Sequence, residues 1–92
     1  MAHVLERRKE QRQPAEETVR LFSQALDSAG VSAQLIDKSS EGFRAIHDCH
    51  EMMSGEVVRF AWPGESGRAR VLWTRIQSER AESGFWIESR DS

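Results

Sequence analysis

The 92-residue chain is long enough for one domain with one hydrophobic core and too short for two. Hydrophobic residues make up 38% and charged residues 30%, and no apolar run approaches the ~20 residues that cross a bilayer. The net charge of −2, from 13 basic and 15 acidic residues, argues against a protein that coats nucleic acid non-specifically.

The N-terminal sequence and the cysteine content point to the cytoplasm. No apolar segment of the secretory kind follows Met1, and the single cysteine, Cys49, cannot form an internal disulfide. Basic residues concentrate near the start, where four of them accompany one acid: Arg7, Arg8, Lys9 and Arg12 with Glu10. Arginine suits bidentate recognition of phosphates and guanine edges, although a solvated arm is the simplest interpretation of such a run.

Residues 14–30 give mixed signals. An early proline, two acids, apolar residues three and four apart and a final glycine are typical of a helix: Pro14, Glu16, Glu17, Val19, Phe22, Leu26 and Gly30. The alternation of Val19 with Leu21 supports a strand only weakly. Periodicity alone therefore favours a helix here.

Period-two alternation dominates the remainder of the chain. It predicts strands, each with one buried face, in four segments: Val31–Leu35, Val57–Trp62, Arg68–Thr74 and Phe85–Ile87. Turn signals punctuate the chain at Asp27–Gly30, Lys38–Gly42, Met53–Glu56, Pro63–Gly67 and Glu79–Gly84. Short connections make the strands antiparallel, and closure into a barrel keeps the apolar face of the sheet from water.

Two short motifs carry the candidate chemistry. Arg8 to Arg12 reads R-x-x-x-R, a spacing that eleven arginines make common by chance. Asp37 to Gly42 reads D-x-S-x-x-G on the turn after an alternating strand, and by itself this fits an ordinary turn. The order of the two motifs is more specific than either alone.

Together the motifs resemble the double signature of the PilZ family. The resemblance continues through later segments that are similar to the family's strands: Phe43–Ile46, Glu56–Phe60, Gly67–Trp73 and Ser83–Ile87. It implies an all-β, six-stranded antiparallel barrel over residues 14–92, preceded by a flexible arginine-rich arm over residues 1–13. It also implies a strand near Glu16–Gln24, against the helix that periodicity favours.

The resemblance further implies a receptor domain for cyclic di-GMP, a bacterial second messenger. It assigns ligand binding to Arg8, Arg12, Asp37, Ser39 and Gly42, with Arg7 as a contact to a second nucleotide. The chemistry fits these assignments. Arginine forks match guanine edges and phosphates, a carboxylate accepts guanine N–H groups, and a hydroxyl can donate to a phosphate. Glycine permits a backbone geometry or close approach that a Cβ would block.

One position departs from the family pattern, because Glu41 precedes Gly42 where relatives often have glycine. A carboxylate there would weaken binding of a dianion unless it points outward. Whether one or two nucleotides bind stays open at this point.

Other residues give weaker indications of a functional site. His47–Glu51 resembles a metal site in composition, but its spacing matches no standard zinc pattern. Trp62, Trp73 and Trp86 are expected in the core or at a barrel end. Ser39 has no evident histidine and aspartate partners, so catalysis is not expected. No resident cofactor or metal is expected either.

The expected function is therefore a signalling module whose arm becomes ordered over the barrel on ligand binding and is read by an effector protein. Two alternatives remain. One is a PilZ-like protein-interaction module of motility or pilus assembly that binds no nucleotide. The other is a small barrel that binds single-stranded nucleic acid through tryptophans and arginines, which the acidic balance disfavours. No membrane association is expected.

Overall fold

The computed structural model describes residues 13–14, 17–22 and 30–91, and all regular structure in these ranges is β. The seven strands are β1 (Gln13–Pro14), β2 (Thr18–Phe22), β3 (Val31–Lys38), β4 (Gly42–His47), β5 (Val57–Trp62), β6 (Glu65–Gln77) and β7 (Arg80–Arg90). In the described ranges no helix is long and apolar enough to span a bilayer.

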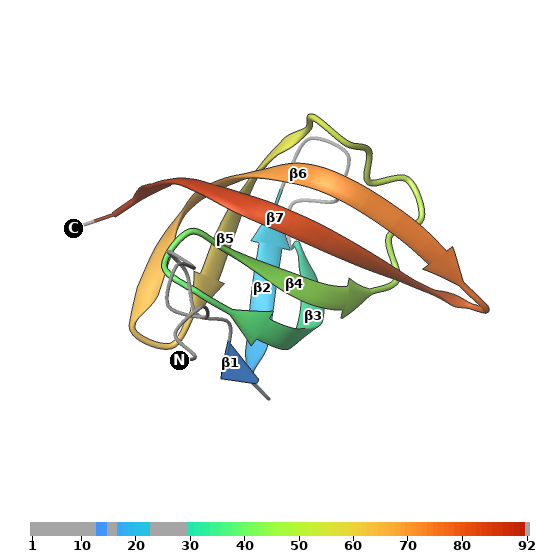
Figure 1. The fold of residues 1–92 in the computed structure, drawn as a ribbon, viewed down its shortest axis with the longest axis horizontal. Helices are drawn as coiled ribbons and strands as arrows, with labels where there is room; N and C mark the ends of the chain where they lie inside the picture. Colours follow the sequence, from blue (N-terminus) through green and yellow to red (C-terminus); the bar gives the residue numbers. More distant parts are fainter. Residues whose placement is uncertain (1–12, 15–16, 23–29, 92) are drawn as a thin grey trace, which may run out of the picture.

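Six of the strands form a closed antiparallel barrel, as expected. Neighbouring strands follow the order β3-β2-β5-β6-β7-β4, and pairing of β3 with β4 closes the ring (Figure 1). The two-residue strand β1 pairs with the end of β3, on the same edge of β3 as β2. Closure leaves no edge strand along the ring, which removes the main aggregation hazard of a sheet.

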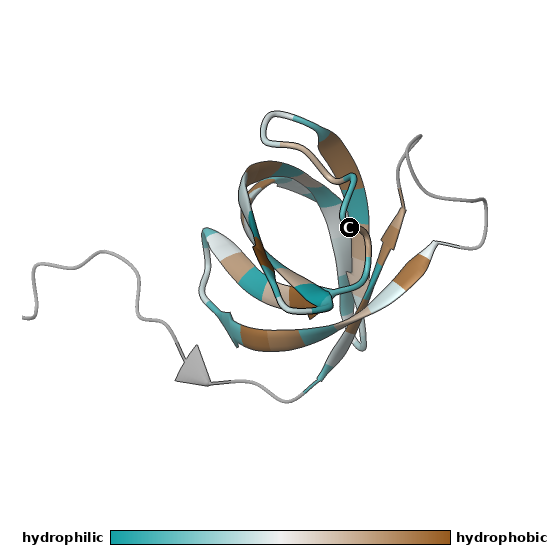
Figure 2. Ribbon diagram, turned by 90° about the vertical axis from the view of Figure 1, so that its right-hand side faces the viewer, coloured by the Kyte–Doolittle hydropathy of each residue, from teal (hydrophilic) through white to brown (hydrophobic). Residues whose placement is uncertain are grey.

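The barrel interior is filled by the alternate residues of each strand. In β5, for example, the buried positions are Val58, Phe60 and Trp62, and polar or exposed residues occupy the other face. Figure 2 shows this alternation of apolar and polar positions around the ring. Four aromatic side chains pack together at the centre, with ring centroids 4.5–5.4 Å apart: Phe43, Phe60, Trp62 and Phe85.

Residues 18–22 form a strand, as expected from the resemblance for the region near Glu16–Gln24, and the helix favoured by periodicity is wrong for this stretch. Val19 and Leu21 are fully buried, and β2 pairs with both β3 and β5. Burial on one face and two hydrogen-bonded neighbours outweigh the local helix signals of the preceding proline and acids. Residues 15–16 and 23–29, which carried part of those signals, lie outside the described residues.

Two of the predicted turns are shorter than the sequence suggests. The connection of β5 to β6 consists of Pro63 and Gly64 alone, and that of β6 to β7 of Ser78 and Glu79 alone. The residues Glu65–Gly67 and Arg80–Gly84 belong to strands, contrary to the prediction. Tertiary pairing extends these strands through residues that favour turns locally.

Strands β6 and β7 are the longest, with 13 and 11 residues. They form a curved hairpin that crosses the barrel and projects beyond it at one end (Figure 1). A register shift between Val71 and Trp73 interrupts the alternation of β6. Trp73 consequently does not share the buried face of Ala69 and Val71 as predicted, because a bulge moves the following side chain to the other face.

Candidate ligand site at the β3–β4 turn

The D-x-S-x-x-G motif lies at the tight connection between β3 and β4. The Ser39 N–H donates to the Gly42 carbonyl at 2.8 Å, so these residues close the turn and Ser40 and Glu41 form its tip. Asp37, near the end of β3, and Gly42, at the start of β4, therefore lie at the same end of the β3–β4 hairpin. The motif is a compact hairpin turn, as the sequence predicts.

A bulge aims Asp37 at the outer face of the barrel. The pairing of β3 with β4 shifts register between Leu35 and Asp37, so Leu35 pairs with buried Ala45 and Asp37 pairs with Arg44. Without the bulge, period-two geometry would place Asp37 on the same inward face as Leu35. The bulge therefore positions a carboxylate beside a guanidinium.

Asp37 is bound within the protein by Arg44. The Arg44 Nε donates to Asp37 Oδ2 at 3.0 Å, and Nη2 makes a second, short contact with the same oxygen. The Asp37 side chain is 10% exposed and that of Arg44 is 39% exposed. The hydrogen bond to Asp37, with the attraction of Asp37 and Glu82, raises the pKa of Arg44 despite partial burial.

Ser39 helps to hold the turn. Its hydroxyl accepts from the Glu41 backbone N–H at 3.2 Å and donates to the Gly42 carbonyl at 3.4 Å. Such local bonds are the usual role of serine in turns. To donate to a phosphate, the hydroxyl would have to exchange its long contact with Gly42 for a stronger, charge-assisted one.

Gly42 is required by the packing of the barrel itself. A Cβ on Gly42 would overlap the backbone carbonyl oxygen of Phe85 on the neighbouring strand β7. The close approach predicted for this glycine is thus an approach of protein backbone, and the structure accounts for the residue without any ligand.

Glu41 is tied to the barrel through its backbone. Its carbonyl accepts from the Ile87 N–H at 2.9 Å, and the neighbouring Ser40 carbonyl accepts from Arg90 Nη2 at 2.7 Å. Both bonds come from β7, so the turn is anchored to the strand that also approaches Gly42. The tip of the turn is a fixed part of the barrel surface.

The chain that leads out of the arginine motif runs beside this turn. In β1, Gln13 pairs with Lys38 and Pro14 pairs with Asp37. The same stretch is held further along, where the Glu17 carbonyl accepts from the Leu35 N–H at 2.9 Å. Lys38 Nζ also bonds Glu17 Oε1 at 3.0 Å and lies 5.0 Å from the centre of the Trp62 ring.

The three predicted arginine contacts, Arg7, Arg8 and Arg12, lie outside the described residues, as do all residues of the arm expected over residues 1–13 except Gln13, which belongs to β1. Of the six predicted ligand residues, the structure therefore brings together Asp37, Ser39 and Gly42. The pairing of Gln13 with Lys38 places the residue immediately after Arg12 alongside them.

Two of the three tryptophans are exposed, contrary to the prediction. Trp62 is buried, but Trp73 is 37% and Trp86 45% exposed on the outer face of the barrel. Trp73 covers Gly84, where a Cβ would meet its ring, and the Arg75 guanidinium lies 5.7 Å from the ring centre. These rings rest on the outside of the sheet because the bulge and the strand register direct them there.

His47 belongs to a buried hydrogen-bond network. The Cys49 N–H donates to Nδ1 at 3.1 Å, so Nε2 carries the proton of the neutral ring and donates to Ser83 Oγ at 2.8 Å. Ser83 Oγ lies 2.7 Å from Thr74 Oγ1. Burial lowers the pKa of His47. In the described ranges no group of three or more possible metal ligands occurs.

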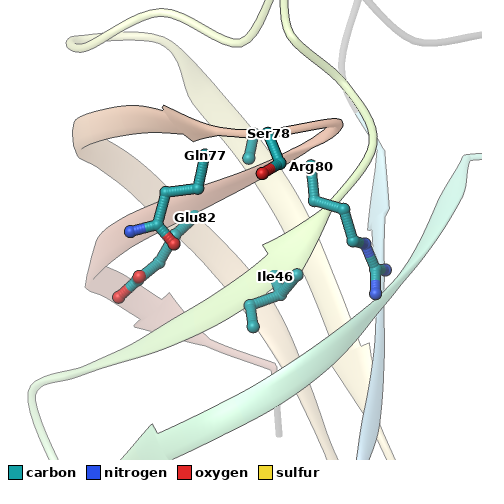
Figure 3. Close-up of a pocket in the computed structure, with 6 residues that line it drawn as sticks. Ile46, Gln77, Ser78, Arg80 and Glu82 are labelled. Carbon is teal, nitrogen blue, oxygen red and sulfur yellow. The ribbon is translucent and has the colours of Figure 1, made fainter.

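A shallow hollow of about 290 Å³ lies near the tip of the β6–β7 hairpin (Figure 3). Its lining residues are Ile46, Gln77, Ser78, Arg80, Ala81 and Glu82. Arg80 is engaged by Asp48 at 3.3 Å. The hollow contains none of the predicted ligand residues, and it approaches the β3–β4 turn only through Glu82, which contacts Arg44.

Sequence reasoning did not identify Arg44 and Glu82 as site residues. Arg44 could have been found from its alternation in β4, which places it outward between the inward Phe43 and Ala45. Glu82 lies within the turn predicted for Glu79–Gly84, so nothing in the sequence indicated that it belongs to β7 and pairs with Ile46.

Comparison with known proteins does not assign the chain to a family. No protein-family model matches the sequence, and no curated protein is similar enough to count as a relative.

Proposed function

We propose that this chain is a receptor domain for cyclic di-GMP, without catalytic activity, as the resemblance of its two motifs to the PilZ family implies. The observation that carries the proposal is the pairing of β1 with β3, in which Gln13 and Pro14 lie opposite Lys38 and Asp37. This pairing brings the chain adjoining R-x-x-x-R to the D-x-S-x-x-G turn. The residue that follows the first motif thereby lies beside the second, although Arg12 and Asp37 are 25 positions apart in sequence.

Each proposed binding residue matches a different chemical group of cyclic di-GMP. Asp37 presents a carboxylate for guanine N–H donors, and Ser39 presents a hydroxyl for a phosphate oxygen. Arg8 and Arg12 supply the positive charge that a dianion needs, with forks that fit guanine edges or phosphates. Arg7 would contact a second nucleotide, if two bind.

The proposed output is a change in the N-terminal segment. Binding would draw residues 7–12 onto the outer barrel face beside Asp37 and Ser39, and charge-assisted bonds would offset the loss of chain entropy. A partner protein would read the new surface. The residue that follows this segment, Gln13, is paired with Lys38 of β3, beside the turn.

Calorimetric titration with cyclic di-GMP tests the proposal. The unaltered protein should release heat on binding, and the double variant Arg8→Ala/Arg12→Ala should not bind while unfolding at the same urea concentration. The matched control is Arg59→Ala/Arg70→Ala, which removes two exposed arginines from β5 and β6. Absence of binding by the unaltered protein at high micromolar ligand, or normal binding by Arg8→Ala/Arg12→Ala, would refute the proposal.

A second candidate, binding of single-stranded nucleic acid, is favoured by one observation. Trp73 and Trp86 are partly exposed on the outer face, and Arg75 lies over one of them, as in stacking platforms for bases. The net charge of −2 and the pairing of Arg75 with Glu82 favour the first proposal instead. Quenching of tryptophan fluorescence by an oligonucleotide, with a steep salt dependence, would support the second candidate.

A further inference from the structure

We infer that Arg44 is a positioning residue for ligand binding, held in place by Glu82, and that it fixes the orientation of the Asp37 carboxylate. This inference rests on the proposed function. It concerns three charged residues on three neighbouring strands, β3, β4 and β7. Arg44 spans the two acids, with Nε 3.0 Å from Asp37 Oδ2 and Nη1 3.5 Å from Glu82 Oε2.

This contact holds the Asp37 side chain, while strand pairing with Pro14 and Arg44 holds its backbone. Asp37 directly follows the β3 bulge, where the regular ladder is interrupted. Both Arg44 nitrogens that reach Asp37 converge on Oδ2. A planar guanidinium with two contacts holds Oδ2 in place more closely than the flexible, single-point ammonium of a lysine would.

Glu82 in turn holds Arg44. Its side chain is only 10% exposed, and its other oxygen, Oε1, accepts from Arg75 Nη2 at 3.1 Å. The row Asp37–Arg44–Glu82–Arg75 thus alternates in charge across the sheet. A buried carboxylate with cations on both sides has little freedom to turn, so Arg44 is constrained from the side opposite Asp37.

Directional recognition of guanine needs such a constraint. Guanine N–H groups bind a carboxylate whose oxygens lie at defined positions, and an acceptor already held in place avoids the entropic cost of reaching them. The inference predicts that Arg44 acts on the ligand only through Asp37, and that Glu82 acts only through Arg44.

A double-mutant cycle with cyclic di-GMP titrations tests this. Arg44→Met and Arg44→Lys should each weaken binding roughly tenfold, because neither retains the two-nitrogen contact, and Glu82→Gln should weaken it by a smaller factor. In an Asp37→Asn background, Arg44→Lys should cause no further loss. Arg70→Met, which removes an exposed arginine paired with Glu88, is the matched control and should bind normally.

Arg44→Met leaves two acids without their shared partner and can destabilise the fold, so the conclusion rests on Arg44→Lys and Glu82→Gln with unfolding midpoints measured alongside. Normal binding by folded Arg44→Lys would overturn the inference while the proposed function stands. The inference would also be overturned if Arg44→Lys weakened binding by the same factor in the unaltered protein and in the Asp37→Asn variant, since Arg44 would then act independently of Asp37. If the unaltered protein does not bind, the proposed function and the inference both fall.

Discussion

At the scale of single residues, the D-x-S-x-x-G motif serves the fold as well as the proposed ligand. Asp37 is bound by Arg44, Ser39 supports the turn, and Gly42 allows β7 to approach. A motif of this kind can therefore be retained for stability alone. Experiments must separate the two roles, and the most structural of the three residues, Gly42, offers the simplest case.

Gly42→Ala should destabilise the ligand-free protein by about 1–3 kcal/mol, because the added methyl group overlaps the Phe85 carbonyl and the strands must separate. The free energy of unfolding in urea measures this. Ser40→Ala, at the exposed tip of the same turn, should leave it within about 0.5 kcal/mol. Equal stability of Gly42→Ala and the unaltered protein would show that the backbone approach is not as tight as described.

His47 should make stability depend on pH. Burial lowers its pKa below the ordinary 6.5, against the attraction of Asp48 and with His50 and Arg80 acting in the same direction as burial. Below about pH 6.5 the unfolded chain therefore gains a proton that the folded protein does not. The free energy of unfolding should fall as pH decreases from 7.5 toward the folded pKa, by at most about 1.4 kcal/mol per pH unit from this group.

An NMR titration of the His47 ring measures the pKa directly, and urea unfolding at several pH values measures the slope. His47→Gln should reduce the slope between pH 7.5 and 5.5, because glutamine does not titrate. An ordinary or raised His47 pKa would contradict the buried network with Ser83 and Cys49.

At the scale of elements, the sequence predicted most of the barrel and failed where tertiary contacts overrode local signals. The strands β3 and β5 follow from alternation alone. The strand β2 did not, because Val19, Phe22 and Leu26 fit a helical spacing and the two neighbouring strands that bury Val19 are distant in sequence.

The bulges explain the errors in the site. Alternation assumes an uninterrupted strand, and a single extra residue reverses every later position. For β6 this changed Trp73 from an expected core residue to an exposed one. For β3 it created the contact of Asp37 with Arg44, which no sequence pattern indicated. The turn itself was predictable from its residues, whereas its charged neighbours on other strands were not.

Removal of residues 1–12 should leave the barrel folded. Closure is completed by β3 and β4, and the two paired residues of β1, Gln13 and Pro14, remain in the truncated protein. The urea midpoint of the truncated protein should stay close to that of the full chain, and binding of cyclic di-GMP should be lost with the arginines. Unfolding of the truncated protein would show that the N-terminal residues belong to the core structure.

At the scale of the whole molecule, the arrangement separates a rigid scaffold from a site at one edge. The aromatic core of Phe43, Phe60, Trp62 and Phe85 lies directly behind the strands that carry the turn. Phe43 follows Gly42, so the site and the core share one strand. The proposed ligand would therefore be held by the turn and the N-terminal arginines without any change in the shape of the barrel.

Cyclic di-GMP is proposed to bind at the β3–β4 turn, beside the start of β1. Mapping backbone amide shifts during a titration of the isotope-labelled protein tests it most directly. Large shifts are expected at Arg8, Arg12, Asp37 and Ser39, and none at Arg59 and Arg70, the control positions on β5 and β6. No shifts at the first four residues at high micromolar ligand, or shifts confined to the hollow at the hairpin tip, would contradict the proposal.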